Sequence, residues 1–418
     1  MPNTQSERQN PVPSRNSIDA ELNRLTGDVA RQSRPIRVAL VHYRDDPRVG
    51  GSLRVGETLA NHLDPRRVEA HLVFAYGGPG PVAQNAKVPC HHLDSSGPAD
   101  LPSWLRARRF FARLQPDIIH FQDSAVWLNL ALMGTTYRKL IHVHGRPIVS
   151  EMRWFDRFLN RMIIGSSDGA VCITNGARET VAGLGWAKSD NCWTLYNSID
   201  SSAYSDLPTS AEARKRLALP ANAHLLGMVC RLVPEKGCRN AIDLLRRLPS
   251  SWHLVFCGDG PLRPELERRS RATGLAERIH FLGALGDVRP VYAALDAYLF
   301  LTEYEPFGLV IGEAMAAGVP VFGWRRAGEY SELRKPLVTP DNSIFIGSGL
   351  PANASAEGSA VLDKLASAIE ICGDCPQAYS NVVATARRWV MSTFSPQEQA
   401  DSARSLYERA LAMPVIRG

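Results

Sequence analysis

The sequence predicts an α/β protein made of two Rossmann-like parallel-sheet domains that face each other across a cleft. From residue 36 onward, short β-branched apolar runs alternate with helical segments, a pattern typical of parallel sheets covered by helices. A polar stretch bounded by prolines, 201–223, divides this alternation into two halves. Two open sheets of this kind offer the carboxyl ends of their strands to a cleft, and we expect the chemistry there.

The N-terminal segment and the cysteines indicate a cytoplasmic protein. Residues 1–34 are polar and lack the apolar core of a secretory signal, so we expect a flexible tail. No window approaches about 18 consecutive apolar residues, so we expect no transmembrane helix. The cysteines lie mainly in apolar runs, as reduced thiols do. Cys372 and Cys375 form a lone CxxC without a second ligand pair, so we expect no metal site.

The first half, residues 35–205, reads as one Rossmann-like domain. Its strand-like runs are apolar throughout, which suits strands buried on both faces. These runs are 36–42, 69–76, 117–122, 140–144, 169–174 and 192–197, with a helix expected at 53–63.

The second half, residues 206–390, reads as a second Rossmann-like domain. Its strand-like runs are 224–230, 252–258, 278–283, 297–302 and 319–324, and its helices are expected at 238–248, 262–273 and 308–317. Residues 347–360 read as a surface loop. We expect a final helix within 391–418 that packs back toward the first domain.

Net charge separates the classes of partner. Forty-eight Lys and Arg against 42 Asp and Glu leave a charge of +6, spread along the chain. A nucleic-acid-binding protein concentrates its positive charge on one face, so we expect no nucleic acid. An anionic small substrate or an anionic membrane surface is at least as good an explanation of this charge.

The stretch EPFGLVIGEAMAAGVPV, residues 305–321, places one carboxylate before a helix and another within it. If the helix begins near Gly308, the free amides of Gly308, Leu309 and Val310 attract phosphate. Glu313 lies on the same helix face as Leu309, where it is suited to accept ribose hydroxyls. Solvated acids at a helix end are the simpler reading, but Glu313 lies within an apolar run where a surface acid is unexpected.

A second cluster, GMVCRLVPEKGCRNAI at 227–242, places Arg231 and Lys236 on one strand-to-helix loop. Two cations there can neutralise an anionic leaving group, although a solvated basic loop is the alternative. Gly50 and Gly51 precede the first helix, where they favour a further phosphate-binding helix start. Gly258, after a buried strand, lets the backbone approach a ligand closely.

Two histidines end the 140–144 run. We expect the side chains of His142 and His144 to lie on opposite faces of the sheet, with His144 facing the cleft as an acid, a base or a hydrogen-bond donor. A structural histidine is an equally good reading.

With these motifs assembled, the chain resembles the retaining family-4 glycosyltransferases of the GT-B fold. The matching elements are Gly50-Gly51, DIIHFQ, HVHG, LYNSID at 195–200, R-L-x-x-E-K-G, CGDGP, FLG and the E-x7-E motif, in order over roughly residues 36–335. The resemblance implies a UDP- or GDP-sugar donor, a glycan or lipid-linked acceptor, and surface polysaccharide or glycoconjugate synthesis. It assigns the acceptor to the first domain, 35–205, and the nucleotide sugar to the second, 206–390. It implies no metal and no cofactor beyond the donor.

The resemblance also implies roles for individual residues. Arg231 and Lys236 would bind the donor diphosphate, Glu305 the transferred sugar, and Glu313 the ribose. His144 would lie near the reacting sugar. The remaining donor contacts would come from Gly50, Gly51, Gly258, Phe307, Gly308, Leu309 and Val310. The configuration would be retained through an oxocarbenium-like state, with the leaving phosphate assisting deprotonation of the acceptor.

The chain departs from the family after residue 324. RRAGEYSEL replaces the usual Gly-Gly and Glu, so either Glu329 or Glu332 could fill the acidic position. Alternative functions are a GT-B sugar-nucleotide epimerase, a phosphorylase and a silent sugar-nucleotide-binding partner. The intact Arg231, Lys236, Glu305 and Glu313 argue against a silent member.

Two basic amphipathic segments, 104–114 and 152–163, suggest peripheral contact with the inner face of a membrane. Packing of both against the first sheet is the simpler interpretation, and we favour it.

Overall fold

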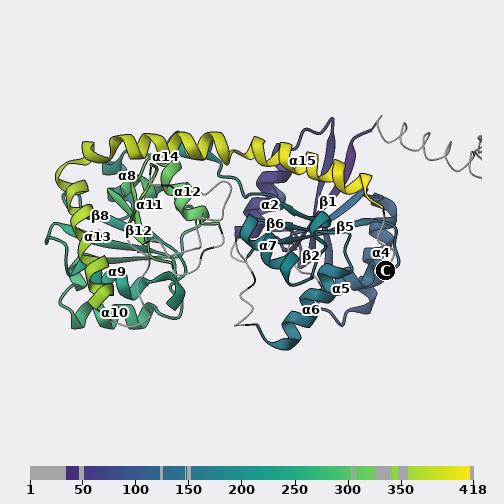
Figure 1. The fold of residues 1–418 in the computed structure, drawn as a ribbon, viewed down its shortest axis with the longest axis horizontal. Coiled ribbons are helices and arrows are strands. Elements are labelled where there is room, and N and C mark those ends of the chain that lie inside the picture. The colour runs from purple at the N-terminus through teal and green to yellow at the C-terminus, as the bar shows by residue number, and fades with distance from the viewer. Residues whose placement is uncertain are drawn as a thin grey trace, which may run out of the picture.

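The computed structural model describes residues 34–46, 51–122, 126–145, 147, 152–302, 305, 307–324, 339, 341–346 and 356–414. In this part of the chain the predicted architecture is confirmed: two parallel sheets, each covered by helices, lie side by side (Figure 1). No helix in these ranges is long and apolar enough to cross a bilayer.

The first domain has a seven-stranded sheet with the order β3-β2-β1-β4-β5-β6-β7. Its strands are β1 (Ile36–Arg44), β2 (Val68–Tyr76), β3 (Cys90–Ser95), β4 (Ile118–Phe121), β5 (Arg138–Val143), β6 (Gly169–Cys172) and β7 (Cys192–Thr194). Its helices are α2 (Gly51–His62), α3 (Pro81–Asn85), α4 (Leu101–Leu114), α5 (Val126–Ala131), α6 (Trp154–Gly165) and α7 (Asn175–Gly183). All neighbouring strands pair in parallel.

The second domain has a six-stranded parallel sheet with the order β10-β9-β8-β11-β12-β13. Its strands are β8 (His224–Val229), β9 (Trp252–Cys257), β10 (Ile279–Gly283), β11 (Ala297–Phe300), β12 (Val321–Trp324) and β13 (Ile344–Ile346). Its helices are α8 (Ser210–Arg216), α9 (Cys238–Leu245), α10 (Arg263–Ala272), α11 (Arg289–Ala294), α12 (Leu309–Ala316), α13 (Ala356–Asp374) and α14 (Ser380–Thr393).

Burial on both faces explains the apolar strand runs. In β1, Val38 and Leu40 belong to one core cluster, whereas Ala39 and Val41 belong to another. Because successive side chains point to opposite faces of a strand, the two clusters lie on the two sides of the sheet. Both positions of each pair must therefore be apolar, and the sequence shows no alternation.

The chain end returns to the first domain. Helix α15 (Pro396–Ala412) follows α14 and runs over the first domain alongside α2 (Figure 1). Ala403, Leu406 and Tyr407 are buried in the same core cluster as Val38 and Leu40. The Tyr407 hydroxyl is hydrogen-bonded to His120 Nδ1 on β4, at 2.9 Å. The first-domain core is thus completed by a helix that comes after the second domain in sequence.

Candidate functional site

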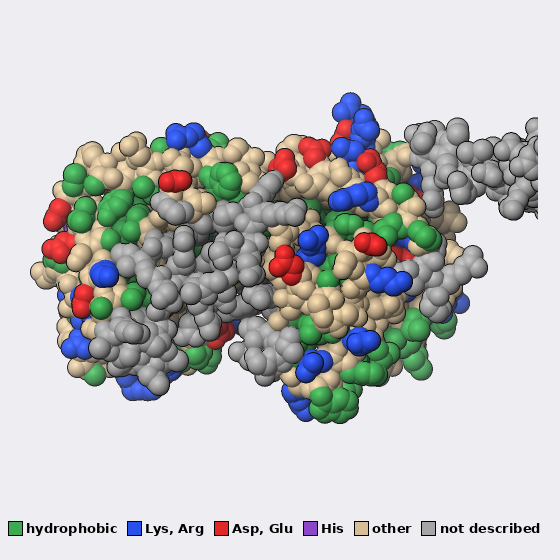
Figure 2. All heavy atoms as spheres, in the orientation of Figure 1, with side chains coloured by type: hydrophobic (Ala, Val, Ile, Leu, Met, Phe, Trp, Pro, Cys, Tyr) green, Lys and Arg blue, Asp and Glu red, His purple; other side chains and the backbone are tan. Residues whose placement is uncertain are grey.

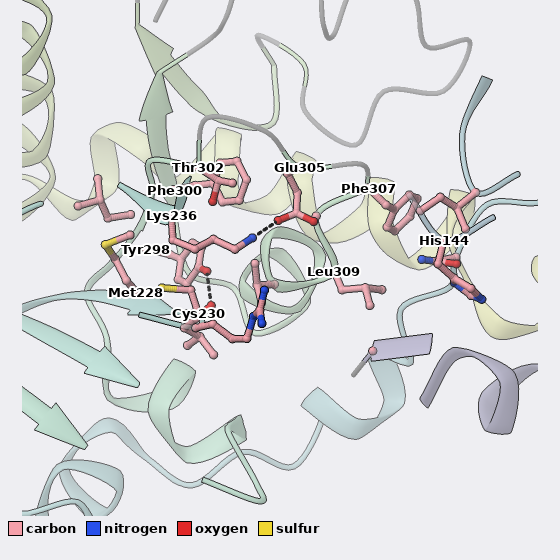
Figure 3. A pocket seen from close by; sticks show the side chains of 18 of the residues that line it. His144, Met228, Cys230, Lys236, Tyr298, Phe300, Thr302, Glu305, Phe307 and Leu309 are labelled. Atoms are coloured by element: carbon pink, nitrogen blue, oxygen red, sulfur yellow. Dashed lines mark hydrogen bonds and ion pairs between the residues drawn. The ribbon is translucent and has the colours of Figure 1, made fainter. Parts of the chain in front are cut away.

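A cleft of about 500 Å³ lies between the two domains (Figure 3). The first domain contributes Gly51, Ser52, His144, Ile173 and Asn197 to its lining. The second domain contributes, among others, Arg231, Lys236, Glu305 and the consecutive residues Phe307, Gly308, Leu309 and Val310. Most of the sequence-predicted site residues therefore meet at one place.

Lys236 and Glu305 form an ion pair on the wall of this cleft. The Lys236 Nζ lies 2.8 Å from Glu305 Oε2, and each side chain is about one-fifth exposed, at 20% and 19%. Figure 3 shows this contact, with His144 on the other side of the view, beyond Phe307 and Leu309. The sequence predicted both residues for the site but not their pairing.

The local backbone explains why this lysine reaches this glutamate. Lys236 ends a short 3₁₀ turn, η4 (Pro234–Lys236), and Gly237 follows it with a φ of 70°. A Cβ on Gly237 would lie 2.4 Å from the Leu301 carbonyl oxygen. The glycine thus lets the loop after β8 pack against the end of the neighbouring β11, from which the chain continues to Glu305.

Arg231 differs from Lys236 in its freedom. Its side chain is 78% exposed, and within the described part of the chain its acidic partner is Glu235, at 4.0 Å. A contact of this length between exposed groups contributes little to stability. The guanidinium is therefore available to bind an anion with two parallel hydrogen bonds at small energetic cost.

Two helix N-termini open onto the same cleft. Helix α12 begins after Gly308, which has a φ of 87° and no side chain to cap the helix. Helix α2 begins at Gly51, where a Cβ would lie 3.2 Å from Leu309 Cδ1 of α12. Free amides and the positive end of each helix dipole favour an anion between them.

Glu313 lines a neighbouring cavity of about 490 Å³ instead of the main cleft, and Leu309 borders both. Burial raises the pKa of the Glu313 carboxyl, although a hydrogen bond from the Tyr292 hydroxyl, at 2.8 Å, and the nearby Arg54 act against this shift. Arg54 donates to the Gly286 carbonyl oxygen at 3.1 Å, so both domains form this cavity. The two acids of the E-x7-E motif therefore line two different cavities, and Leu309 borders both.

The prediction for the histidines was wrong in one respect. His142 and His144 do not lie on opposite faces, because residues two apart on a strand share a face. Their rings stack with centroids 4.1 Å apart, and His144 Nε2 lies 3.2 Å from Gln122 Oε1. His144 does line the cleft, whereas His142 is buried, and burial holds the pKa of His142 well below its usual range.

Gly258 is not among the described residues that line this cleft, so its predicted contact with the donor stays a prediction. It has a φ of 136°, and a Cβ there would lie 1.9 Å from the Cys230 carbonyl oxygen. The glycine thus serves close packing of two strand ends. Gly50, Glu329 and Glu332 lie outside the described residues, so their predicted roles stay predictions.

Some lining residues were not singled out from the sequence. Asn197 is 5% exposed, and its Oδ1 has no hydrogen-bond partner among the described residues. It borders the cleft, where a ligand hydroxyl can donate to it. The only signal was its place in LYNSID, which matched a family element without a role. Tyr292 and Arg54 could not be predicted from the sequence, because only the folded chain brings them close to Glu313.

Two Rossmann-like parallel-sheet domains with a cleft between them define a protein of the GT-B class. Residues 209–356 match the family model for glycosyl transferases group 1, and residues 49–203 match that for glycosyltransferase family 4. Together these two matches cover most of the chain, and the chain belongs to glycosyltransferase family 4.

Individual relatives share parts of this sequence. The 2-deoxystreptamine glucosyltransferase of Streptomyces kanamyceticus is 26% identical over 334 residues, 75% of this chain and 82% of that protein. The lipopolysaccharide core biosynthesis glycosyltransferase LpsE of Rhizobium meliloti is 32% identical over 163 residues, 39% of this chain and 46% of that protein. The GDP-mannose-dependent α-(1-6)-phosphatidylinositol dimannoside mannosyltransferase of Mycobacterium tuberculosis is 34% identical over 252 residues, 56% and 63% of the two chains. The chain thus spans about half the length of the second of these relatives and less than two thirds of the third.

Among solved structures, Anabaena Alr3699/HepE in complex with UDP and glucose superimposes with a TM-score of 0.73. The superposition covers 89% of this chain and 99% of the Anabaena chain, and the two sequences are 19% identical. A likeness at that identity concerns the fold, and it confirms the GT-B architecture.

Proposed function

We propose that this chain is a retaining glycosyltransferase that moves a sugar from a UDP- or GDP-sugar to a glycan or lipid-linked acceptor, in the synthesis of a surface polysaccharide or glycoconjugate. The observation that carries the proposal is the cleft, where Arg231, Lys236 and two helix N-termini converge. Fixed positive groups of this kind stabilise a diphosphate as it leaves. The family membership supports the same reaction class.

The cleft residues have separate tasks in this reaction. Lys236 and Arg231 neutralise the leaving diphosphate. Their positive charges take the place of the magnesium ion that supplies this charge in other enzymes. In this proposal Glu305 binds hydroxyls of the transferred sugar, and Glu313, in the adjoining cavity, accepts hydrogen bonds from the ribose hydroxyls. His144, on the opposite wall, faces the acceptor side of the sugar. The leaving phosphate then assists deprotonation of the acceptor hydroxyl.

The base of the donor stays open between uracil and guanine. One relative is named for GDP-mannose, and one structural neighbour was solved with UDP. A thermal-shift panel with UDP-glucose, UDP-N-acetylglucosamine and GDP-mannose ranks the donors, because a ligand at 100 times its Kd adds about 2.7 kcal/mol of stability.

The central test uses Lys236→Ala and Glu305→Ala. Each is expected to lower sugar transfer by at least about 10²-fold while the circular dichroism spectrum stays that of the native chain. Arg239→Ala is the matched control, because Arg239 forms an ion pair with Glu265 in the same domain, outside the cleft lining. Native-like turnover in either cleft variant would refute the assigned roles. An α-linked product from an α-linked donor, observed by NMR, supports retention.

A further inference from the structure

Helix α6 (Trp154–Gly165) exposes an unusual number of large apolar side chains. Trp154 is 78% exposed, and Phe158, Phe155 and Met162 are 51%, 49% and 49% exposed. Single exposed apolar residues are common, but a contiguous group with two or more aromatics marks a contact surface. Figure 2 shows green side chains with blue ones beside them along the lower edge of the first domain, where Figure 1 places α6.

The exposed groups follow the helical period. At about 100° per residue, Trp154, Phe158, Met162 and Phe155 fall within one arc of roughly 100°. Arg157 and Arg161 border this arc on one side, and both are exposed. An apolar arc edged by arginines is the arrangement of a helix that lies in the headgroup layer of an anionic bilayer.

Helix α4 (Leu101–Leu114) provides a contrast within the same domain. Its sequence has a similar basic amphipathic pattern, but there Ala107 and Phe111 are fully buried, and Trp104 packs against the first-domain core. The simpler interpretation, packing against the sheet, therefore holds for the aromatic face of α4. It does not hold for α6, whose aromatic face points to solvent.

The inner side of α6 borders a cavity of about 350 Å³. Asn160, Ile163 and Ile164 of α6 line it together with Trp186. His144 lines both this cavity and the interdomain cleft. One helix thus has an exposed aromatic face on its outer side and forms the wall of a pocket next to the cleft on its inner side.

We propose that the outer face of α6 docks on an anionic phospholipid surface, and that the cavity behind it receives the polar head of an acceptor carried by that membrane. The second part rests on the proposed function, since it assigns the acceptor class for the same site. The charges on this surface favour an anionic partner. Arg157 and Arg161 border the aromatic face and Arg153 precedes the helix, against one acid on the helix, Asp156. Phospholipid headgroups supply the negative charge, and the upper acyl region accepts the aromatic rings.

Vesicle sedimentation with the full chain tests the docking. The wild-type chain is expected to bind vesicles of phosphatidylglycerol and phosphatidylcholine more tightly than vesicles of phosphatidylcholine alone, and to dissociate in high salt. Trp154→Ser with Phe158→Ser is expected to lower the partition coefficient by about ten-fold or more. Arg157→Gln and Arg161→Gln are expected to lower it by about five-fold for each charge removed.

Matched controls come from the second domain. Ile371 on α13 and Met391 on α14 are 50% and 46% exposed, so Ile371→Ser with Met391→Ser removes two exposed apolar side chains elsewhere on the protein. The proposal is supported if the wild-type chain and this control variant both bind the vesicles and the α6 variant does not. Failure of the wild-type chain to bind, or equal binding by the α6 variant, overturns it. So does a lipid-free dimer that the α6 substitutions abolish, because a second copy then covers this face.

Donor binding is measured in the same samples to separate the two proposals. The α6 variant is expected to keep the wild-type thermal shift with the preferred nucleotide sugar, because α6 does not line the interdomain cleft. A chain that binds anionic vesicles but no nucleotide sugar contradicts the proposed function and leaves the membrane docking supported. A chain that binds the donor but no vesicle contradicts the docking alone.

Discussion

Lys236 and Glu305 pair on the wall of the cleft, so a diphosphate that binds Lys236 must compete with Glu305 for the same ammonium group. Glu305→Gln keeps the shape of the side chain and removes its charge. We expect this variant to bind UDP or GDP about five-fold more tightly, since an anion next to the phosphates is lost. Transfer should still fall by about 10²-fold, because the sugar contact is weakened.

Isothermal titration with both nucleoside diphosphates measures the first effect, and a transfer assay measures the second. Lys236→Ala is the informative partner variant, because it should weaken diphosphate binding instead. Weaker diphosphate binding by Glu305→Gln would contradict the assignment of Lys236 to the phosphates.

Tyr292 and Glu313 form a hydrogen-bonded pair beside the second cavity. Burial raises the pKa of the Glu313 carboxyl, so it takes up a proton at higher pH than an ordinary glutamate, and the Tyr292 hydroxyl favours the charged form. Tyr292→Phe should therefore raise this pKa further. If Glu313 binds ribose as a carboxylate, donor affinity should fall as the pH drops from 7.5 to 5.5, more steeply in the variant.

Donor dissociation constants at the two pH values check this expectation. Tyr379→Phe is the control, since its hydroxyl bonds to the Ala368 carbonyl oxygen, away from both cavities. Equal pH dependence in wild type and Tyr292→Phe would show that Glu313 is not coupled to donor binding.

At the scale of elements, periodicity predicted most of the sheets. Each predicted strand overlaps an observed one, because strands buried on both faces have a strong apolar signal. The two missed strands lie at sheet edges. β3 has the sequence CHHLDS, whose histidines are only partly buried, and β13 spans three residues. Edge strands bury less surface, so their sequence signal is weak.

The elements also explain how much of the site was predictable. Motifs placed Arg231, Lys236 and Glu305 at strand ends, and carboxyl ends of neighbouring parallel strands meet at one edge. The ion pair joins residues 69 positions apart, which depends on the packing of Gly237 against Leu301. The sequence likewise could not predict that the aromatic face of α4 is buried and that of α6 exposed, since both helices have the same kind of basic amphipathic pattern.

Helix α12 shows how packing overrides propensity. Alanine is the better helix former by about 1 kcal/mol, but a Cβ on Gly312 would lie 2.6 Å from Ile199 Cγ1. Gly312→Ala should therefore destabilise the chain by about 1–3 kcal/mol. Gly176→Ala in α7, where a Cβ meets nothing within 4 Å, should instead be neutral or stabilising by up to about 1 kcal/mol. Urea unfolding of both variants measures the difference, and a stabilising Gly312→Ala would contradict the packing argument.

For the whole molecule, α15 ties the end of the chain to the first-domain core. Tyr407 is fully buried between α15 and the sheet, where it meets His120. Tyr407→Ala should lower the free energy of unfolding by about 3–5 kcal/mol, as the loss of a large buried side chain does. The first domain therefore depends for its stability on residues that follow the second domain.

The same contact makes global stability depend on pH. Burial lowers the pKa of His120 to about 3, and the neighbouring His144 and His42 act in the same direction. In the unfolded chain the pKa of a histidine is about 6.5. Between these values the unfolded state binds a proton that the folded state does not, so the free energy of unfolding decreases as the pH falls. The loss is on the order of 1 kcal/mol per pH unit between about pH 6 and pH 3, and the buried His142 adds to it in the same direction.

Urea unfolding at pH 7, 6 and 5 measures this slope. His120→Gln removes one titrating group, so its stability should fall less steeply with decreasing pH than that of the wild type. Tyr407→Phe is the control: it loses the hydrogen bond to His120, about 1 kcal/mol at every pH, but keeps the histidine and therefore the slope. If His120→Gln retains the full wild-type slope, the proton taken up on unfolding belongs to another group and the buried imidazole is not its source.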